Sequence, residues 1–515
     1  MLEIYDCTLR EGMQAEGISF TLSDKLAVIK ALDSLGIAYI EAGTPGSNPK
    51  DEELFHKLRD VETAAQIVAF GATRRKELTC EEDENLAALA SAGTDVVAVY
   101  GKAWDKQVTE VLRTELDENI AMVRESVAFL REAGKRVFFD AEHYFDGAES
   151  DPEYAFAVIE AAHAAGAERV ILCDTNGGTL PHVVGERVAA AKMRLPDAVF
   201  GIHCHNDAGL AAASTITAAI AGAAQIHGTL AGVGERCGNA DLTCVIPDLQ
   251  LKCGMPCLPD GRLERITPVA RKVAEYLNIK IPNRAPFIGK SAFAHKGGAH
   301  IDGVLKNSAA FEHISPEAVG NKRRLLVSEL SGRAAVRRLL ERILPDTPVS
   351  DDQVGAVLAE LKRLEAQGYQ FEGAEESLEL RVLALLGLRK KPFEVDYFKI
   401  IGETDRGENY TATAMVSLHV GDERKITAAE GMGPVNALDN ALRRALTAFY
   451  PCISQVILRD FKVRVIDNKD STAAKVRVLI ESSDGVSTWT TVGVSADVIE
   501  ASFIALSDSL EYKLR

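Results

Sequence analysis

The sequence predicts an α/β protein: a closed (β/α)8 barrel of the TIM type, followed by a helical linker region and a C-terminal α+β domain. Three observations lead to this prediction. Eight short apolar runs alternate with amphipathic segments over the first 255 or so residues, at a spacing of roughly thirty residues. Polar side chains directly follow several of these runs, and beyond about residue 390 the chain becomes β-rich. A doubly wound open sheet is the competing fold for the first half.

The eight apolar runs are the predicted parallel strands, because strands covered on both faces are nearly continuous in apolar residues. They span residues 2–5, 37–40, 66–71, 95–100, 136–140, 169–173, 199–203 and 225–230. Several of the segments between them begin at Ser or Asp and end near Gly, as helices do. The clearest predicted helices span residues 23–35, 116–133 and 152–165.

Prolines interrupt this pattern from residue 256 onward, and helices are next predicted at 333–343 and 351–367. The last part of the chain contains a weak internal repeat, in which predicted strands over 398–420 and 461–494 each precede a helix. Glycines at 431, 433 and 493 are expected at the two helix starts, where backbone N–H groups could bind a carboxylate. The predicted domains are residues 1–275, 276–390 and 391–515.

Composition limits the classes of partner. The chain has 515 residues, 47% of them apolar, and a formal charge of -17 from 58 basic and 75 acidic side chains. No broad basic surface for nucleic acid is therefore expected, and the short basic cluster at residues 73–76 is expected to be a solvated loop. No apolar run has the length of a membrane span and no signal peptide is recognised, which predicts a cytoplasmic protein. Nine scattered cysteines favour reduced thiols.

The ends of the predicted strands carry the residues that suggest chemistry. His203 and His205 lie at i and i+2 after an apolar run, so their imidazoles share one face and suit a divalent metal, although two satisfied polar residues are the alternative. Residues 232–239 are predicted to form a tight loop that presents Asn239. A barrel gathers all the strand ends at one mouth. The other polar residues at these ends include Arg10, Glu11, Glu41, Asp140, Glu142 and Thr175.

At this point the sequence resembles a known family. The strings DCTLREG at 6–12, HCHNDAGLA at 203–211 and GERCGN at 234–239 are similar to the three signatures of the acyl-CoA-dependent Claisen-condensing metallolyase barrels, which are the isopropylmalate, homocitrate and citramalate synthases. Other strings, among them FGATRRK, DAEHYFDG and LCDTNGGTLPH, are most similar to the citramalate branch. Glu11 and Phe311 stand where these enzymes usually carry Asp and Tyr.

The resemblance implies a role for each of the residues at the barrel mouth. A divalent metal (Mg, Mn or Zn) would be held by Glu11, His203, His205 and Asn239. Arg10 would stabilise the developing alkoxide, and Glu41 would fix Arg10 or act as a structural ion pair. Thr175 and Asp140 would contact substrate. Either Glu142 or His300 would be the base that forms the enolate.

The resemblance also implies substrates, an effector and an assembly. The expected reaction is transfer of the acetyl group of acetyl-CoA to an α-keto acid, with pyruvate as the expected acceptor, giving citramalate and CoA for isoleucine biosynthesis. Another acceptor, as in isopropylmalate or homocitrate synthesis, is the first alternative; a metal-dependent aldolase or lyase and a non-enzymatic amino-acid sensor are further ones. The C-terminal domain would bind a branched-chain amino acid, isoleucine above all. The linker would reach over the partner's barrel in a homodimer and place His300 there.

Overall fold

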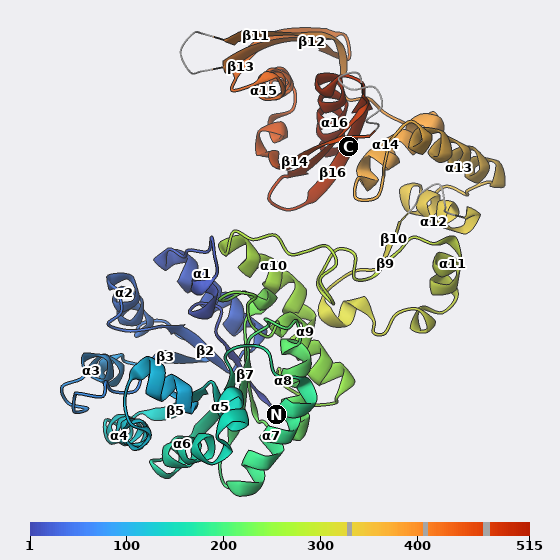
Figure 1. The fold of residues 1–515 in the computed structure, drawn as a ribbon. Helices are drawn as coiled ribbons and strands as arrows, with labels where there is room; N and C mark the ends of the chain where they lie inside the picture. Colours follow the sequence, from blue (N-terminus) through green and yellow to red (C-terminus); the bar gives the residue numbers. More distant parts are fainter. Residues whose placement is uncertain (327–331, 405–409, 467–473) are drawn as a thin grey trace. The chain divides into compact units, whose positions relative to one another are not determined.

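The computed structural model describes residues 1–326, 332–404, 410–466 and 474–515, and it confirms the predicted fold class (Figure 1). Eight parallel strands pair in chain order, and β1 pairs with β8 to close the barrel. The strands are β1 (Glu3–Asp6), β2 (Tyr39–Gly43), β3 (Gln66–Ala72), β4 (Val96–Lys102), β5 (Arg136–Glu142), β6 (Arg169–Asp174), β7 (Phe200–Cys204) and β8 (Gln225–Gly228). The chain forms two compact units, residues 1–293 with 313–323, and residues 294–312 with 324–515.

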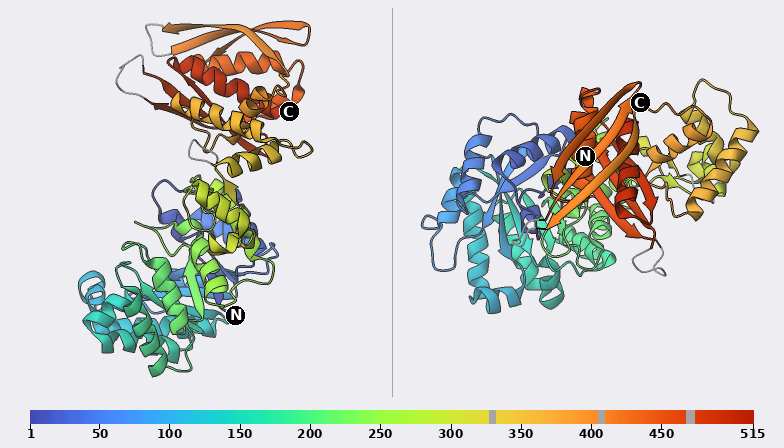
Figure 2. Two further views of the ribbon diagram at one scale, coloured as in Figure 1. Left: turned by 90° about the vertical axis from the view of Figure 1, so that its right-hand side faces the viewer. Right: turned by 90° about the horizontal axis from the view of Figure 1, so that it is seen from above.

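Helices surround the barrel (Figures 1 and 2). They are α1 (Leu22–Leu35), α2 (Pro49–Leu58), α3 (Glu84–Ser91), α4 (Leu116–Glu132), α5 (Tyr144–Ser150), α6 (Pro152–Ala164), α7 (Pro181–Arg194), α8 (Ala211–Ala221), α9 (Leu242–Pro247) and α10 (Ile266–Tyr276). Local sequence fixes their ends. Thr21 and Asp24 form a capping box at the start of α1, and Gly36 ends that helix with a φ of 90°.

Two apolar layers stabilise the barrel. Helix side chains pack on the outer face of the strands in one large cluster. A smaller cluster fills the interior, where Tyr5, Tyr39 and Phe138 are buried against one another. The proline-rich stretch after β8 stays with the barrel, because Ile266 and Val269 of α10 belong to the outer cluster. The domain limits at residues 275 and 390 remain predictions.

The second unit begins with β9 (Ala294–His295), which is followed by α11 (Gly298–Lys306). The strand β10 (Arg324–Leu325) pairs with β9 in parallel. Three helices follow, α12 (Arg333–Ile343), α13 (Asp351–Ala366) and α14 (Glu375–Leu385), with a shared apolar core.

The predicted repeat is present in the rest of this unit. In each half, three antiparallel strands precede one helix: β11 (Glu394–Thr404), β12 (Tyr410–Val420), β13 (Glu423–Gly431) and α15 (Pro434–Leu446), then β14 (Ile457–Val465), β15 (Val476–Ser483), β16 (Thr488–Ser495) and α16 (Val498–Lys513). The two helices lie side by side and share one core (Figure 2).

The expectation for the glycines near α15 and α16 was wrong for the second half. Gly493 lies inside β16 and pairs with Val478, so it is not at a helix start. A Cβ at Gly493 would overlap the carbonyl of Ala501 in α16, and one at Gly431 would overlap the backbone of Ala437 in α15. Both glycines therefore permit a helix to approach its sheet closely. Among the described residues, no helix is both long and apolar enough to cross a membrane.

Candidate active site

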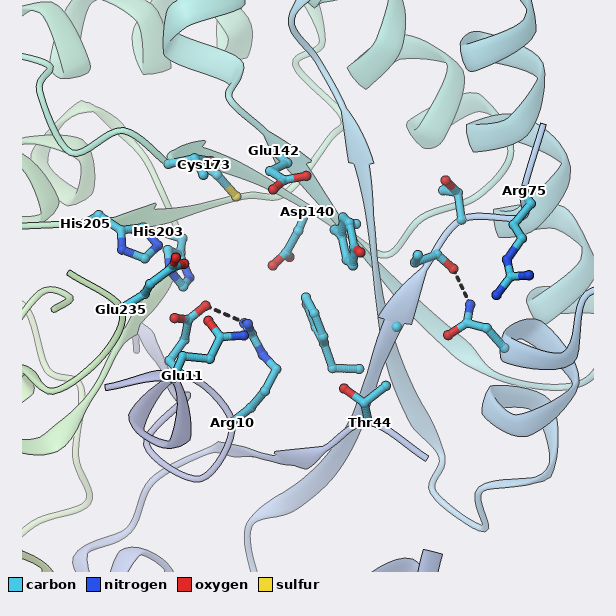
Figure 3. A pocket seen from close by; sticks show the side chains of 18 of the residues that line it. Arg10, Glu11, Thr44, Arg75, Asp140, Glu142, Cys173, His203, His205 and Glu235 are labelled. Carbon is cyan, nitrogen blue, oxygen red and sulfur yellow. Dashed lines mark hydrogen bonds and ion pairs between the residues drawn. The ribbon is translucent and has the colours of Figure 1, made fainter. Parts of the chain in front are cut away.

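A cavity of about 590 Å³ opens at the carboxyl ends of the barrel strands (Figure 3). The structure brings most of the predicted site residues to its wall, although they come from four strand ends. The predicted residues that line it are Arg10, Glu11, Asp140, Glu142, Thr175, His203 and His205, and further lining residues include Thr44, Phe70, Arg75, Tyr100, Cys173 and Glu235. Glu41 lies beneath this wall, fully buried.

Three of the four predicted metal ligands form one group. Glu11, His203 and His205 each offer a ligand atom, and these atoms lie within 4.8 Å of one another. Two buried oxygens, Oε2 of Glu11 and Oδ1 of Asn239, have no hydrogen-bond partner among the described residues. An unpaired buried oxygen is costly, and a bound cation would satisfy both. Two imidazoles and two oxygens fit a first-row divalent ion or magnesium.

Backbone geometry brings Asn239 to this group. His205 and Asn239 form an isolated β-bridge, and Nδ2 of Asn239 donates to the carbonyl of Val233 at 3.1 Å. That bond uses the amide nitrogen and leaves Oδ1 for the site. The loop before Asn239 needs Gly234 and Gly238, whose φ angles are 152° and 85°, a region that favours glycine. The predicted tight loop is therefore confirmed.

The local electrostatics set the protonation states that a metal requires. Burial opposes ionisation of Glu11, but the guanidinium of Arg10 and the adjacent histidine rings lower its pKa to about 2. Burial lowers the pKa of His203 to about 3 and also lowers the pKa of His205. The carboxylate is therefore charged and both imidazoles are neutral near pH 7, which is the ligand state.

Arg10 is fixed on three sides. Its Nε donates to Oε1 of Glu41, and its Nη1 donates to Oε1 of Glu11 at 2.6 Å. The other oxygen of Glu41 accepts the hydroxyl of Tyr5 at 2.6 Å. The guanidinium carbon lies 3.7 Å from the ring centroid of Phe70, a cation-π distance. These contacts hold the planar cation rigidly beside the metal group.

Thr175 and Asp140 differ in how they are held. The backbone N–H of His143, a residue with a φ of 59°, donates to Oγ1 of Thr175 at 2.9 Å. The hydroxyl proton of Thr175 therefore remains available as a donor. Oδ1 of Asp140 is buried without a partner among the described residues. Burial, followed by the nearby charge of Glu41, raises the pKa of Asp140 well above its usual range.

Glu142 forms an ion pair with Lys102, a residue that was not among the predicted site residues. The two residues are register partners at the ends of β5 and β4. The prediction ended β4 at residue 100, so it did not include this lysine among the strand-end residues. A polar residue two positions past an apolar run was the signal that could have revealed it.

The solvated loop expected at residues 73–76 was wrong in part. Thr73 and Arg74 are buried, and Arg74 pairs with Glu118 and Glu125 of α4 at 2.8 Å each. Arg75 and Lys76 are exposed, and Arg75 reaches the cavity wall.

His300 is the predicted site residue that the barrel unit does not contain. It lies on α11 in the second unit, is exposed, and packs edge-on against Phe311 with ring centroids 5.5 Å apart. It is not among the residues that line the cavity.

Known proteins and family models match this chain over nearly its whole length. A family model described as HMGL-like matches residues 1–271, one described as homocitrate synthase post-HMGL domain-like matches 287–369, and one described as LeuA allosteric (dimerisation) domain matches 372–514. The chain is 48% identical to an (R)-citramalate synthase of Aquifex aeolicus, over 99% of this chain and 97% of that protein. It is 45% identical to an (R)-citramalate synthase of Synechocystis, over 100% and 96%, and 30% identical to a probable 2-isopropylmalate synthase of Methanopyrus kandleri, over 97% and 96%.

Proposed function

Because the chain belongs to the (R)-citramalate synthase branch of the HMGL-like condensing enzymes, we propose that it condenses acetyl-CoA with pyruvate to give citramalate and CoA. The observation that carries this proposal is sequence identity to several such synthases over their full length. The barrel mouth supports it, because Arg10 lies there beside the group of residues that can hold a metal ion. The reaction forms one carbon–carbon bond and hydrolyses one thioester, with water as the second co-substrate.

The metal group comprises Glu11, His203, His205 and Asn239, and members of the family depend on a divalent metal. We propose magnesium, manganese or zinc, because the ligand set mixes imidazole with hard oxygen. An ion bound there would polarise the ketone of the keto acid as a Lewis acid.

Arg10 and Thr175 bind the acceptor in this proposal. The free hydroxyl proton of Thr175 donates to the carboxylate of the keto acid, since its oxygen already accepts the N–H of His143. Nε and Nη1 of Arg10 are engaged by the two glutamates, which orients the rest of the fork toward the ketone oxygen. A preorganised cation at that point stabilises the alkoxide as it forms.

Glu142 is the proposed base of the barrel, because it lines the cavity within which the acetyl group must lie. Its carboxylate takes a proton from the acetyl methyl group, the resulting carbon attacks the ketone carbon, and the ketone oxygen becomes the alkoxide beside Arg10. Lys102 holds Glu142 at the wall. His300 remains the alternative base.

The charges of the cavity favour a small acceptor. Asp140 and Glu142 line the cavity, as do the aromatic rings of Phe70 and Tyr100. A second carboxylate on the acceptor, as in 2-ketoglutarate, would lose its hydration beside these acids and so lose free energy. The methyl group of pyruvate has no such cost.

A second cavity of about 590 Å³ supports the place of acetyl-CoA. It shares Ala72, Thr73, Arg75 and Tyr100 with the first cavity, so the two adjoin. Its other lining residues include apolar side chains suited to a pantetheine arm, which are Leu78, Val111, Leu112 and Met122, and the cation Lys76, which suits a phosphate. A long thioester could therefore extend from one cavity into the other.

The C-terminal module matches an allosteric dimerisation domain, and this match supports a regulated dimer. We propose isoleucine as the effector, as expected for an enzyme that starts the route to that amino acid.

The decisive assay measures free CoA released from acetyl-CoA with pyruvate, 2-ketobutyrate, 2-ketoisovalerate, glyoxylate and 2-ketoglutarate in parallel. Pyruvate should give the highest kcat/KM. A several-fold higher value for 2-ketoisovalerate or 2-ketoglutarate would replace the proposed acceptor with that of a related synthase.

A further inference from the structure

A histidine inside the barrel, His227, lies behind the metal group and has no role in the proposed reaction. It is fully buried on β8, and donor atoms of Cys7, His203 and His227 lie within 4.8 Å of one another. The centroids of the His203 and His227 rings lie 5.7 Å apart, and the two ring planes are inclined by 68°. This arrangement bears on which nitrogen of His203 is free to bind an ion.

A chain of hydrogen bonds fixes the tautomer of His227. Glu3 accepts two bonds from Arg169, at 2.9 and 3.0 Å, and one from Nε2 of Gln225 at 3.1 Å. Because a carboxylate paired with arginine only accepts, the amide nitrogen of Gln225 must face Glu3 and the amide oxygen must face away. That oxygen lies 2.9 Å from Nε2 of His227, which must therefore carry the hydrogen.

The opposite nitrogen of His227 is therefore an acceptor with a fixed direction. With its hydrogen on Nε2, the imidazole of His227 has a lone pair on Nδ1. Tyr5 stacks on the ring with centroids 3.9 Å apart and planes 4° apart, which holds its plane, while Gln225 holds its rotation. Nδ1 of His227 is buried without a hydrogen-bond partner among the described residues.

His203 has the complementary need. A neutral imidazole that gives one lone pair to a metal carries a hydrogen on its other nitrogen, and that N–H requires an acceptor when buried. Nδ1 of His203 is also buried without a partner among the described residues. The neighbouring Sγ of Cys7 is only a weak acceptor.

We propose that His227 is a positioning residue: its Nδ1 accepts the Nδ1 hydrogen of His203 and thereby holds the lone pair of His203 on Nε2, free for the divalent ion. The inference rests on the proposed metal site. A chain of hydrogen bonds would then connect the metal site through His227, Gln225 and Glu3 to Arg169, at the other end of the barrel. Outer partners of metal-binding histidines typically contribute about 10- to 100-fold in metal affinity.

Two variants of His227 separate this role from simple packing. His227→Asn keeps an acceptor near the position of Nδ1 but loses the ring, whereas His227→Phe keeps the ring and its stacking on Tyr5 but loses the acceptor. Full-length protein freed of metal with a chelator is titrated with Mn²⁺, and free Mn²⁺ is followed by electron paramagnetic resonance. We expect His227→Phe to raise the Kd about 10- to 100-fold, and His227→Asn to stay much closer to the unsubstituted protein.

Two outcomes would overturn the proposal: His227→Phe binding Mn²⁺ as tightly as the unsubstituted protein, or His227→Asn weakening binding as much as His227→Phe. Cys7→Ala is the matched control and should change the Kd little, because a thiol is a weak partner. Circular dichroism checks folding, and His227→Leu carries the same expectation if His227→Phe does not fold. Failure of the unsubstituted protein to bind Mn²⁺, or binding that survives His203→Ala, would instead disprove the metal site itself.

Discussion

Glu41 is fully buried under Arg10 and binds the Nε of that guanidinium with one carboxylate oxygen. Its other oxygen accepts the hydroxyl of Tyr5, so both oxygens are engaged. Burial raises the pKa of Glu41, while Arg10 opposes that effect. The arrangement means that the orientation of Arg10 depends on a residue that does not line the cavity.

We therefore expect Glu41→Gln to lower kcat by about 100-fold, the size of loss that a misplaced reacting group can cause. The amide has the same shape but no charge, and it can turn its N–H groups toward the guanidinium. CoA release with saturating pyruvate measures the effect. Tyr5→Phe is the control, since it removes only the hydroxyl bound to Glu41 and should cost a few-fold. An unchanged kcat in folded Glu41→Gln would show that Arg10 is held adequately by its other contacts.

Glu142→Gln tests the base. A positioned general base contributes roughly 10²- to 10⁴-fold, so the variant should lose that much of kcat. It should also stop the exchange of deuterium from solvent into the methyl group of acetyl-CoA, whereas His300→Gln should leave that exchange in place. The reverse result, with exchange lost only in His300→Gln, would assign the base to His300.

The apolar runs were sufficient to predict eight buried strands, because each strand carries its own apolar residues. Closure of the barrel depends on the pairing of β1 with β8, which no single run encodes. The ends of the strands were harder. The strands β4 and β5 continue to Lys102 and Glu142, two residues beyond the predicted limits, since ladder pairing persists after the apolar run stops. The ion pair between these two side chains follows from register, which no single strand encodes.

Other features depend on contacts between distant segments. Arg74 is buried because Glu118 and Glu125, 44 and 51 residues away, neutralise it, so its local sequence suggested an exposed loop. The ligand group was predictable for a different reason: barrel topology brings all strand ends together wherever they fall in the chain. The predicted role of His300 involves a second subunit, and the residues around His300 do not encode that contact.

Metal affinity should depend only weakly on pH. A histidine with an ordinary pKa near 6.5 is protonated as pH falls, and two such ligands would cost about 100-fold in affinity between about pH 7.5 and about pH 5.5. The depressed pKa of His203, about 3, moves this loss to lower pH, and the pKa of His205 is shifted in the same direction. We expect a change of less than about tenfold over that range.

Mn²⁺ titrations of the metal-free protein at the two pH values give this result directly, with circular dichroism to check that the fold persists at the lower pH. A loss near 100-fold would mean that the histidines titrate normally and that their burial is relieved in solution.

Truncation tests the regulatory role of the C-terminal module. The helix α14 packs on β16 and α16, and Arg389 pairs with Asp508 at 3.0 Å and Glu511 at 2.7 Å. A cut before α14 would open the apolar core that this helix shares with α12 and α13, so the cut falls after residue 390, at the cost of exposing the face of α14 that packs on β16 and α16. We expect this shortened protein to release CoA but to lose inhibition by isoleucine. Inhibition that persists in the folded, shortened protein would place the effector site elsewhere.

The last prediction concerns the unit that carries His300. This residue is exposed on α11, packs only lightly against Phe311, and belongs to a compact unit separate from the barrel. An exposed histidine is free to complete a site on another subunit. The match to a dimerisation domain indicates that the protein has such a second subunit. We therefore expect His300 to act on the barrel of the partner.

In that case, a chain with His203→Ala still supplies a sound His300, and a chain with His300→Ala still supplies a sound metal group. Each pure variant dimer has no complete site, but a mixed dimer has one of its two sites intact. Co-expression with two different tags and purification through both gives that dimer, and CoA release should return to about half the activity of the unsubstituted enzyme. The control is the same purification with both chains carrying His203→Ala, which should remain inactive. Activity of a folded, metal-loaded mixed dimer no higher than that of either parent would mean that His300 acts on its own barrel or takes no part in the reaction.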